Sequence, residues 1–391
     1  LHLKDRTFIA FSDDGSITSR FRSSSAGVFQ FQDASFNTRV ELNNSGNVAA
    51  TTFNSIPFYT GNTGSIYTHD VSATENNAFR NTGYGLSTLA VVTTGDDNTA
   101  IGNSAGALIL SGKQNTLIGA AAGDALVGGQ NNVAVGYRAL SNENNDGKNV
   151  AVGADALKQQ RAGADGHNVA VGHHAGEVIS TGTENTIVGS EAADALTTGA
   201  QNVAIGRGAL GSEDTTGKAV AVGYAALNAQ NASTDTFNVA VGYNAGISVS
   251  TGVYNTLIGG QAGENLTTGS DNVAIGLNAL RNEDQHGKNT AIGSGAMQFL
   301  NAGADALNTA VGFQAGRNIT TAIQNAILGA HAGDALTTGA ENVAIGAYAL
   351  STEDAHGTNT AVGNAALMTL DAGSNAHNVA VGYDAGKLMT T

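Results

Sequence analysis

The chain has 391 residues with 53 glycines, one proline, no cysteine, no tryptophan and 5% aromatic residues, which excludes a large core of bulky side chains. Its 32 acidic and 17 basic residues give a net charge of −15, which argues against nucleic acid or an anionic membrane surface as the main partner. No apolar run is long enough to predict a membrane-spanning helix. We expect an elongated molecule with a thin core of Ala, Val, Ile and Leu.

Residues 1–97 are predicted to form a β-rich N-terminal connector module. Apolar and polar residues alternate over residues 28–56, which is typical of strands, and a tight turn is predicted at Asn43-Asn44-Ser45-Gly46. The chain opens at Leu1 and stops inside a repeat at Thr391, so we expect it to be a portion of a longer polypeptide.

Residues 98–391 carry one short motif, an Asn followed four positions later by Gly, as in NTAIG at 98–102 and NVAVG at 168–172. Successive glycines are separated by 17, 17, 17 and 19 residues, and this set of spacings recurs to give a unit of 70 residues. The residues between Asn and Gly are small or β-branched and predict a short strand. Turns rich in Gly, Thr, Asn and Asp follow, such as TTGAQ at 197–201.

A coil of 17 residues cannot bury its apolar side unless neighbouring coils stack on it. The fold class is therefore predicted as all-β, a parallel β-solenoid (β-roll) of about 17 coils. With neighbouring strands about 4.8 Å apart, the shaft would rise on the order of 80 Å.

The recurring asparagine is interpreted as a structural ladder of stacked amides that bond to each other or cap turns. Ala219 replaces it in one copy. The ladder residues named for this role are Asn98, Asn115, Asn132, Asn149, Asn168, Asn185, Asn202, Asn238, Asn255 and Asn272.

Both faces of the predicted strand are apolar. In NVAVG, Val169 and Val171 share one face and Ala170 lies on the other. A single roll would leave one apolar face exposed along its whole length, and three copies around a threefold axis would bury it. We therefore expect a homotrimeric fibre.

No residue pattern singles out a catalytic, cofactor or metal site. Acidic residues recur in two turn columns and are interpreted as solvated turns with salt bridges rather than Ca²⁺ sites, because each turn offers few ligands. These columns are Glu143, Glu213-Asp214, Glu283-Asp284 and Glu353-Asp354, with Lys148, Lys218 and Lys288 five residues after the first three glutamates, and Asp124, Asp194, Glu264 and Asp334. The pair His173-His174 is expected to point to opposite faces of a strand and to hold no metal.

Aromatic residues at or next to the position after the strand glycine are the candidate surface contacts. A ring there either stacks on a sugar or packs between protomers, and the sequence leaves both open. They are Tyr137, Tyr224, Tyr243, Phe313, Tyr348 and Tyr383.

The segment NTAIGNSAG at 98–106 resembles the head repeats of trimeric autotransporter adhesins. This resemblance implies a left-handed parallel β-roll and three chains side by side. The same stretch, with DALTTGAQN at 194–202 and VELNNSGNVAATTF at 40–53, is also similar to phage tail-fibre proteins. That resemblance implies a non-enzymatic fibre on the virion tail that binds a host-surface glycan or outer-membrane receptor and joins other tail or baseplate proteins. The alternatives are a bacterial surface adhesin or filament subunit and, from the enzyme class, a depolymerising tailspike.

Overall fold

The structure is a computed structural model that describes residues 8–13, 16–23, 29–33, 38–42, 48–50, 52–53, 56–57, 59–60, 66–67 and 77–390 except 146 and 376. All regular elements in these ranges are strands. Those that precede the repeats are β1 (Phe8–Asp13), β2 (Ser16–Ser23), β3 (Phe29–Asp33), β4 (Thr38–Leu42), β5 (Val48–Ala50), β6 (Thr52–Phe53), β7 (Ile56–Pro57), β8 (Tyr59–Thr60) and β9 (Ile66–Tyr67).

Strands β1 to β5 form an antiparallel sheet in sequence order, and β6 pairs with β7. β4 pairs with β5 through Leu42 and Val48, so these strands form a hairpin around the predicted turn, while the turn residues themselves lie outside the described residues. β9 pairs antiparallel with β8 and parallel with β10, which leads into the repeats.

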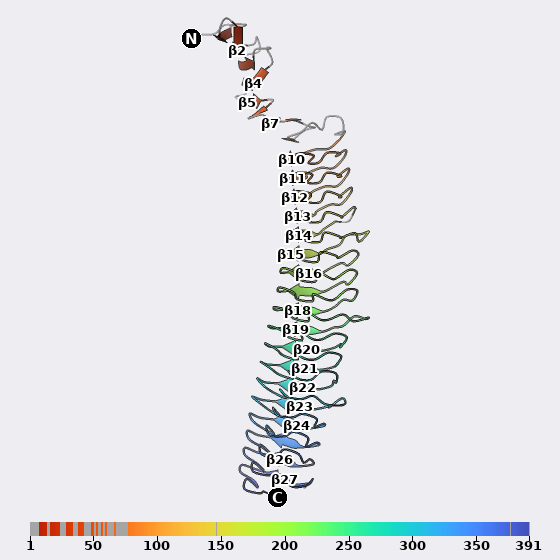
Figure 1. Cartoon of the computed structure of the whole chain (residues 1–391), viewed down its shortest axis with the longest axis vertical. Coiled ribbons are helices and arrows are strands. Elements are labelled where there is room, and N and C mark those ends of the chain that lie inside the picture. Colours follow the sequence, from red (N-terminus) through yellow and green to blue (C-terminus); the bar gives the residue numbers. More distant parts are fainter. Residues whose placement is uncertain are drawn as a thin grey trace.

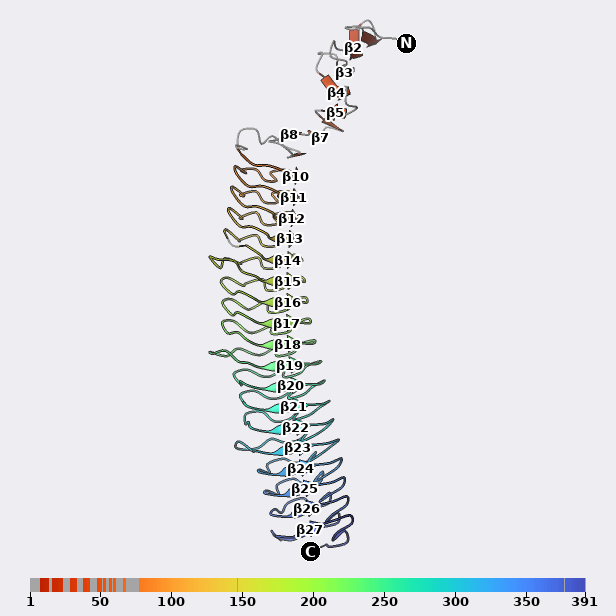
Figure 2. The ribbon, with the colours of Figure 1, turned by 180° about the vertical axis from the view of Figure 1, so that it is seen from behind.

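The repeats form a single parallel ladder of three-residue strands stacked along one axis (Figures 1 and 2). Val169 of one strand, for example, pairs with Val150 before it and Thr186 after it. The strands are β10 (Thr82–Tyr84), β11 (Thr99–Ile101), β12 (Thr116–Ile118), β13 (Val133–Val135), β14 (Val150–Val152), β15 (Val169–Val171), β16 (Thr186–Val188), β17 (Val203–Ile205), β18 (Val220–Val222), β19 (Val239–Val241), β20 (Thr256–Ile258), β21 (Val273–Ile275), β22 (Thr290–Ile292), β23 (Thr309–Val311), β24 (Ala326–Leu328), β25 (Val343–Ile345), β26 (Thr360–Val362) and β27 (Val379–Val381).

The described part of the chain thus forms a parallel β-solenoid with 18 stacked strands, where the sequence predicted about 17 coils. The additional coil contains β10 and the segment NTGYG at 81–85, in which Asn81 and Gly85 have the spacing of the later motif. The ladder therefore starts one coil before residue 98.

The core is a stack of small side chains. The central residue of each strand is buried, and so is an alanine three positions after the strand glycine, such as Ala105 or Ala175. A third column, seven positions after the glycine, supplies larger groups such as Ile109 and Leu126. These three columns explain why the chain folds with so few aromatic residues.

Successive coils fill the core with large side chains from different positions. In the coil with β12, Leu117 fills the core, and a Cβ added at Gly123 would lie 2.8 Å from it. In the next coil the strand centre is Ala134, and Leu140 occupies the position that corresponds to Gly123. The core volume is therefore kept, although the large side chain comes from the strand in one coil and from the turn after it in the next. This alternation is one reason why the sequence repeats over more than one coil.

The glycine that ends each strand is required by both conformation and space. Gly172 has φ +145°, and a Cβ on it would lie 2.3 Å from the carbonyl oxygen of Gly189 in the next coil. Only glycine adopts this backbone conformation without strain. The coils can therefore turn and stack closely only with glycine at this position.

Candidate functional site

The outer face of the strands carries an unbroken apolar column at the third strand position. This column, called here the aliphatic seam, is aliphatic in every described coil except the first. Its residues are Tyr84, Ile101, Ile118, Val135, Val152, Val171, Val188, Ile205, Val222, Val241, Ile258, Ile275, Ile292, Val311, Leu328, Ile345, Val362 and Val381. Many of them, including Ile118 and Leu328, are exposed on the isolated chain. Continuous exposed apolar surface of this kind commonly marks a site of protein–protein contact.

The six aromatic residues predicted as surface contacts are all exposed, by 47% to 78% of their surface. Tyr224 and Tyr243 stack on each other from adjacent coils, with ring centroids 5.5 Å apart. Tyr348 stacks on His331 at 5.3 Å, and Phe313 meets the same imidazole edge-on. Four of the six rings, two of them together with His331, therefore form short columns on the surface.

A second aromatic column was missed by the sequence analysis. Phe237 and Tyr254 stack with centroids 5.8 Å apart, and the Lys218 ammonium lies 5.2 Å from the Phe237 centroid. All three residues directly precede the ladder position, at Ala219, Asn238 and Asn255. An alignment of the coils on their asparagines would have shown this column.

The ladder asparagines are buried, and their side chains bond from coil to coil. The side-chain oxygen of Asn255 accepts the backbone amide of Asn272 at 3.0 Å, and its Nδ2 donates to the carbonyl of Gly269 at 2.9 Å. The Asn255 amide in turn donates to Asn238 Oδ1 at 2.8 Å. The same pattern links Asn98 to Asn115. An amide in this arrangement joins its strand to the turn and the strand of the next coil.

Replacing Asn255 with alanine should loosen the coil that follows. It leaves the Asn272 amide and the Gly269 carbonyl buried without a partner, at a cost of about 1 to 3 kcal/mol. Hydrogen exchange should therefore accelerate at Asn272. Ala219→Asn is the matched control: it supplies the missing amide, and exchange at Asn238 should slow. Equal exchange in all three proteins would contradict this account.

The four recurring glutamates do not lie in solvated turns, as the sequence analysis expected. Glu143, Glu213, Glu283 and Glu353 are fully buried. They occupy the core column that holds Ile109 and Leu126 in the preceding coils, because they also lie seven positions after a strand glycine. The interpretation as solvated carboxylates was wrong for these glutamates.

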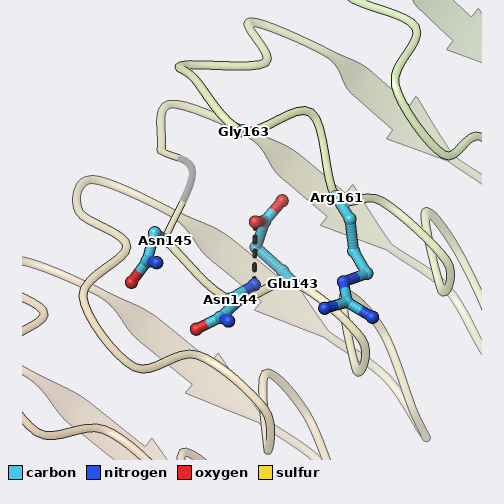
Figure 3. Close-up of a pocket in the computed structure, with 5 residues that line it drawn as sticks. All are labelled: Glu143, Asn144, Asn145, Arg161 and Gly163. Carbon is cyan, nitrogen blue, oxygen red and sulfur yellow. Dashed lines mark hydrogen bonds between the residues drawn. The ribbon is translucent and has the colours of Figure 1, made fainter.

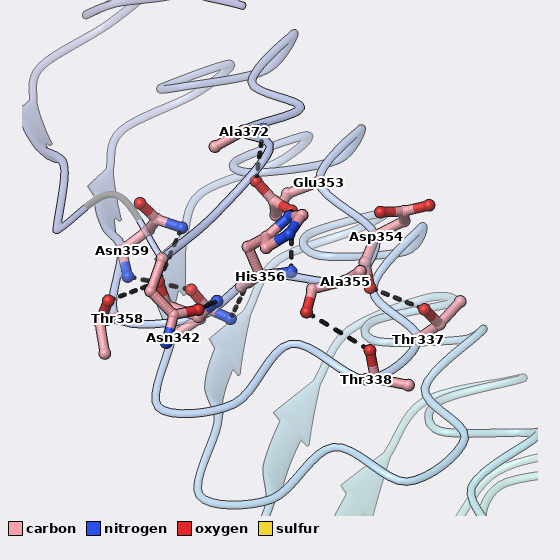
Figure 4. A network of polar contacts seen from close by, with 12 residues as sticks. Thr337, Thr338, Asn342, Glu353, Asp354, Ala355, His356, Thr358, Asn359 and Ala372 are labelled. Carbon is pink, nitrogen blue, oxygen red and sulfur yellow. Dashed lines mark hydrogen bonds and ion pairs between the residues drawn. The ribbon is translucent and has the colours of Figure 1, made fainter. Parts of the chain in front are cut away.

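Each buried carboxylate bonds to backbone amides of its own turn or of the next coil. In Figure 4, Glu353 accepts the His356 amide at 3.0 Å and the Ala372 amide at 3.1 Å. Glu283 does the same with His286 at 3.2 Å and Ala302 at 3.3 Å. Ala302 and Ala372 lie near the middle of the 19-residue coils, so the glutamate satisfies backbone groups within the longer coil. This contact gives a physical reason for the 70-residue period.

The two C-terminal glutamates have a histidine nearby that the sequence analysis did not consider. Glu353, Asp354 and His356 each place one ligand atom within 4.8 Å of the others, as do Glu283, Asp284 and His286. These are the groups of metal-ligating types that the described residues bring together. Both carboxylate oxygens of Glu353 already accept hydrogen bonds from backbone amides, and His356 Nδ1 lies 3.3 Å from one of these oxygens. This arrangement is that of a turn capped by a carboxylate. The repeated sequence EDxH was the available signal.

The Glu283 carboxylate should make the solenoid more stable at acidic pH. Burial raises its pKa above the ordinary 4.5, although the amides of Ala302 and His286 oppose this. The folded coil therefore binds this proton more tightly than the unfolded chain, and the stabilisation is lost as pH rises from 4.5 through the folded pKa. Exchange protection of this coil, compared with Glu283→Gln, should fall as the pH rises above 4.5. Parallel pH profiles for the two proteins would contradict it.

The lysines after the glutamates form ion pairs, but with aspartates of the next coil. Lys148 pairs with Asp165 at 2.6 Å, and the same contacts are Lys218 to Asp235 at 2.5 Å and Lys288 to Asp305 at 2.6 Å. The hydrogen bond from lysine lowers the pKa of each of these aspartates. In the last unit the pair becomes Thr358 and Asn375, so both charges are lost together. These exposed pairs add little stability.

The second acidic column has mixed environments. Burial raises the pKa of Asp124 and of Asp194. At Glu264 burial also acts upward, but hydrogen bonds from Gln261 and Arg281 outweigh it and lower the pKa. Asp334 lies 3.2 Å from His331. A salt bridge to a permanently charged group is thus formed at Glu264, with Arg281 at 2.5 Å, and Asp334 has an imidazole contact instead.

The expectation that His173 and His174 point apart was wrong. Both follow Gly172 in a turn rather than a strand, and their ring centroids lie 3.8 Å apart. His174 Nδ1 contacts the Glu177 carboxylate, which also pairs with Lys158 at 2.8 Å. The alternation rule for strands does not apply in this turn.

A hollow of about 200 Å³ lies where the first long coil leaves the regular stack (Figure 3). It is lined by Glu143, Asn144 and Asn145 from one coil and by Arg161 and Gly163 from the next. The dashed line in Figure 3 is the bond from the Asn144 amide to Glu143, at 2.9 Å. The hollow is thus part of the same glutamate-capped junction.

Comparisons with protein-family models, curated proteins and solved structures found no match to this chain. Within the described residues, no helix has the length and apolar character needed to cross a membrane.

Proposed function

We propose that the chain is a structural, non-enzymatic fibre that mediates attachment to a host-cell surface, as part of a phage tail fibre. The observation that carries this proposal is the aliphatic seam, which continues through the described coils without a charged residue. A rod of stacked coils provides length, and a continuous apolar seam provides a place for sister chains to pack.

Three copies around a threefold axis are the proposed assembly. Ile205 and Ile258 are 36% and 37% exposed on the single chain, so covering them contributes only a part of the about 1.5 to 3 kcal/mol that full burial of an isoleucine is worth. The gain comes from the repetition of this contact along the seam. A closed ring of three chains covers the aliphatic seam of each chain and leaves no seam to which further chains could add.

The antiparallel strands β1 to β5 support the tail-fibre proposal over a bacterial surface adhesin, because an additional β-rich segment precedes the shaft. Other tail or baseplate proteins would bind at this end, and a host glycan or outer-membrane receptor elsewhere on the fibre.

Immunogold labelling tests the location. Antibodies raised against the purified chain should label the tails of virions produced by the host strain. Label confined to the surface of uninfected bacteria would instead establish the adhesin alternative. Release of reducing ends from host capsular polysaccharide by the purified chain would contradict the non-enzymatic proposal.

A further inference from the structure

The shaft surface has a hollow of 390 Å³ that spans four successive coils. It lies beside the stacked rings of Tyr224 and Tyr243, with Arg207 and Asn228 also on its walls. Small-molecule sites in proteins usually have volumes of about 300 to 1,000 Å³. The hollow therefore has the size of a binding site.

The hollow lies where two successive coils carry small residues between coils with longer ones. The position two residues after the strand glycine carries Glu191 and Asn244 in the first and last of these coils. In the two coils between them it carries Gly208 and Ala225, which leave space.

The two tyrosines form an apolar wall. Their rings are nearly parallel, at 14°, and are 47% and 58% exposed. The equivalent position of the next coil is Gly260, so no side chain continues the stack beyond Tyr243. Open ring surface with a hydroxyl at its edge suits a ligand that has both an apolar face and polar groups.

Polar groups surround this wall. The Arg207 guanidinium pairs with Glu191 at 3.1 Å, which leaves further N–H donors on the arginine. Asn228 Nδ2 donates to the carbonyl of Gly208 at 2.8 Å, and the amide oxygen of Asn228 is a further acceptor. The side-chain oxygen of Asn244 is buried and has no hydrogen-bond partner. Planar donors and acceptors thus lie on several sides of the hollow.

We propose that this hollow is a carbohydrate-binding site, in which a sugar ring stacks on Tyr243 and its hydroxyls bond to Arg207 and Asn228. A pyranose offers both an apolar C–H face and a rim of hydroxyls, which are the two features that these side chains complement. This inference rests on the proposed attachment function and adds a ligand class and a place on the shaft.

The test uses the full chain in its native oligomeric state on an array of bacterial capsular and lipopolysaccharide oligosaccharides, followed by calorimetric titration of the bound sugars. Tyr243→Ala should weaken binding at least tenfold, whereas Tyr243→Phe, which keeps the ring, should retain most of it. Tyr137→Ala is the matched control, because Tyr137 lies at the equivalent position of another coil and is 54% exposed, close to the 58% of Tyr243. It should bind like the unaltered chain.

Binding that is lost in the Tyr243→Ala variant but not in the Tyr137→Ala variant supports the site. The absence of any bound sugar, or equal binding by all variants, overturns it. Adhesion of labelled chain to host cells separates this outcome from the proposed function. If all variants adhere equally, attachment stands and the hollow is not the site; if none adheres, the attachment function itself fails.

Discussion

Replacing Gly223 with valine is expected to split the solenoid into two independently melting segments. Gly223 has φ +141°, and a Cβ there would lie 2.2 Å from the carbonyl oxygen of Gly242. Backbone strain and overpacking against a rigid neighbour each cost about 1 to 3 kcal/mol. In a linear array each coil is stabilised only by its neighbours, so one broken interface uncouples the two sides.

Calorimetry and limited proteolysis measure this effect. The variant should show an additional transition and a new cleavage site near residues 223–242. Gly303→Val is the matched control, because no atom lies within 4 Å of a Cβ added there. Identical melting and cleavage of the two variants would show that the glycine column does not hold the coils together.

Two lysines in the aliphatic seam, Ile205→Lys with Ile258→Lys, are expected to convert the fibre into single chains. Both residues are 36% to 37% exposed on the isolated chain, so a lysine there can extend its ammonium group into water when the roll is alone. In a trimer the substitution would bring three ammonium groups together in an apolar environment at each of two levels, and burial of unpaired charge is strongly unfavourable. The native mass should fall from three chains to one.

The control for the seam substitution places the same charges on exposed turns. Thr181→Lys with Thr251→Lys occupies equivalent positions of two coils and should leave the oligomer intact. If the seam variant retains the mass of the unaltered protein, the seam is not the interface.

The sequence predicted the β-solenoid because its signals are local and repeated. The spacing of Asn98 and Gly102, and of the later copies, follows from the length of a coil, and β-branched residues between them favour strands. The first coil was not predicted, since its motif at Asn81 and Gly85 stands apart in composition from the later ones.

The buried glutamates were not predicted because a general rule about charged residues was applied in place of a positional one. Carboxylates are rarely buried unless they are paired or hydrogen-bonded. Counting from the strand glycine would have placed Glu143 in the column of Ile109 and Leu126. The amides that satisfy such a carboxylate, from Ala302 or Ala372, become apparent only when the coils are stacked.

The hollow beside Tyr243 also depends on stacking. The exposed aromatic positions were predicted, but their neighbours across coils, such as Gly208 and Asn228, lie 15 or more residues away along the chain. A single sequence shows well which residues share a position in successive coils. It shows poorly which side chains from different positions meet when the coils stack.

Light scattering of the purified, unaltered chain across a dilution series measures its molar mass in solution. We predict three chains per particle at every concentration at which the rod remains folded, because each roll must cover its aliphatic flank. A stable, soluble particle with the mass of one chain would contradict the account.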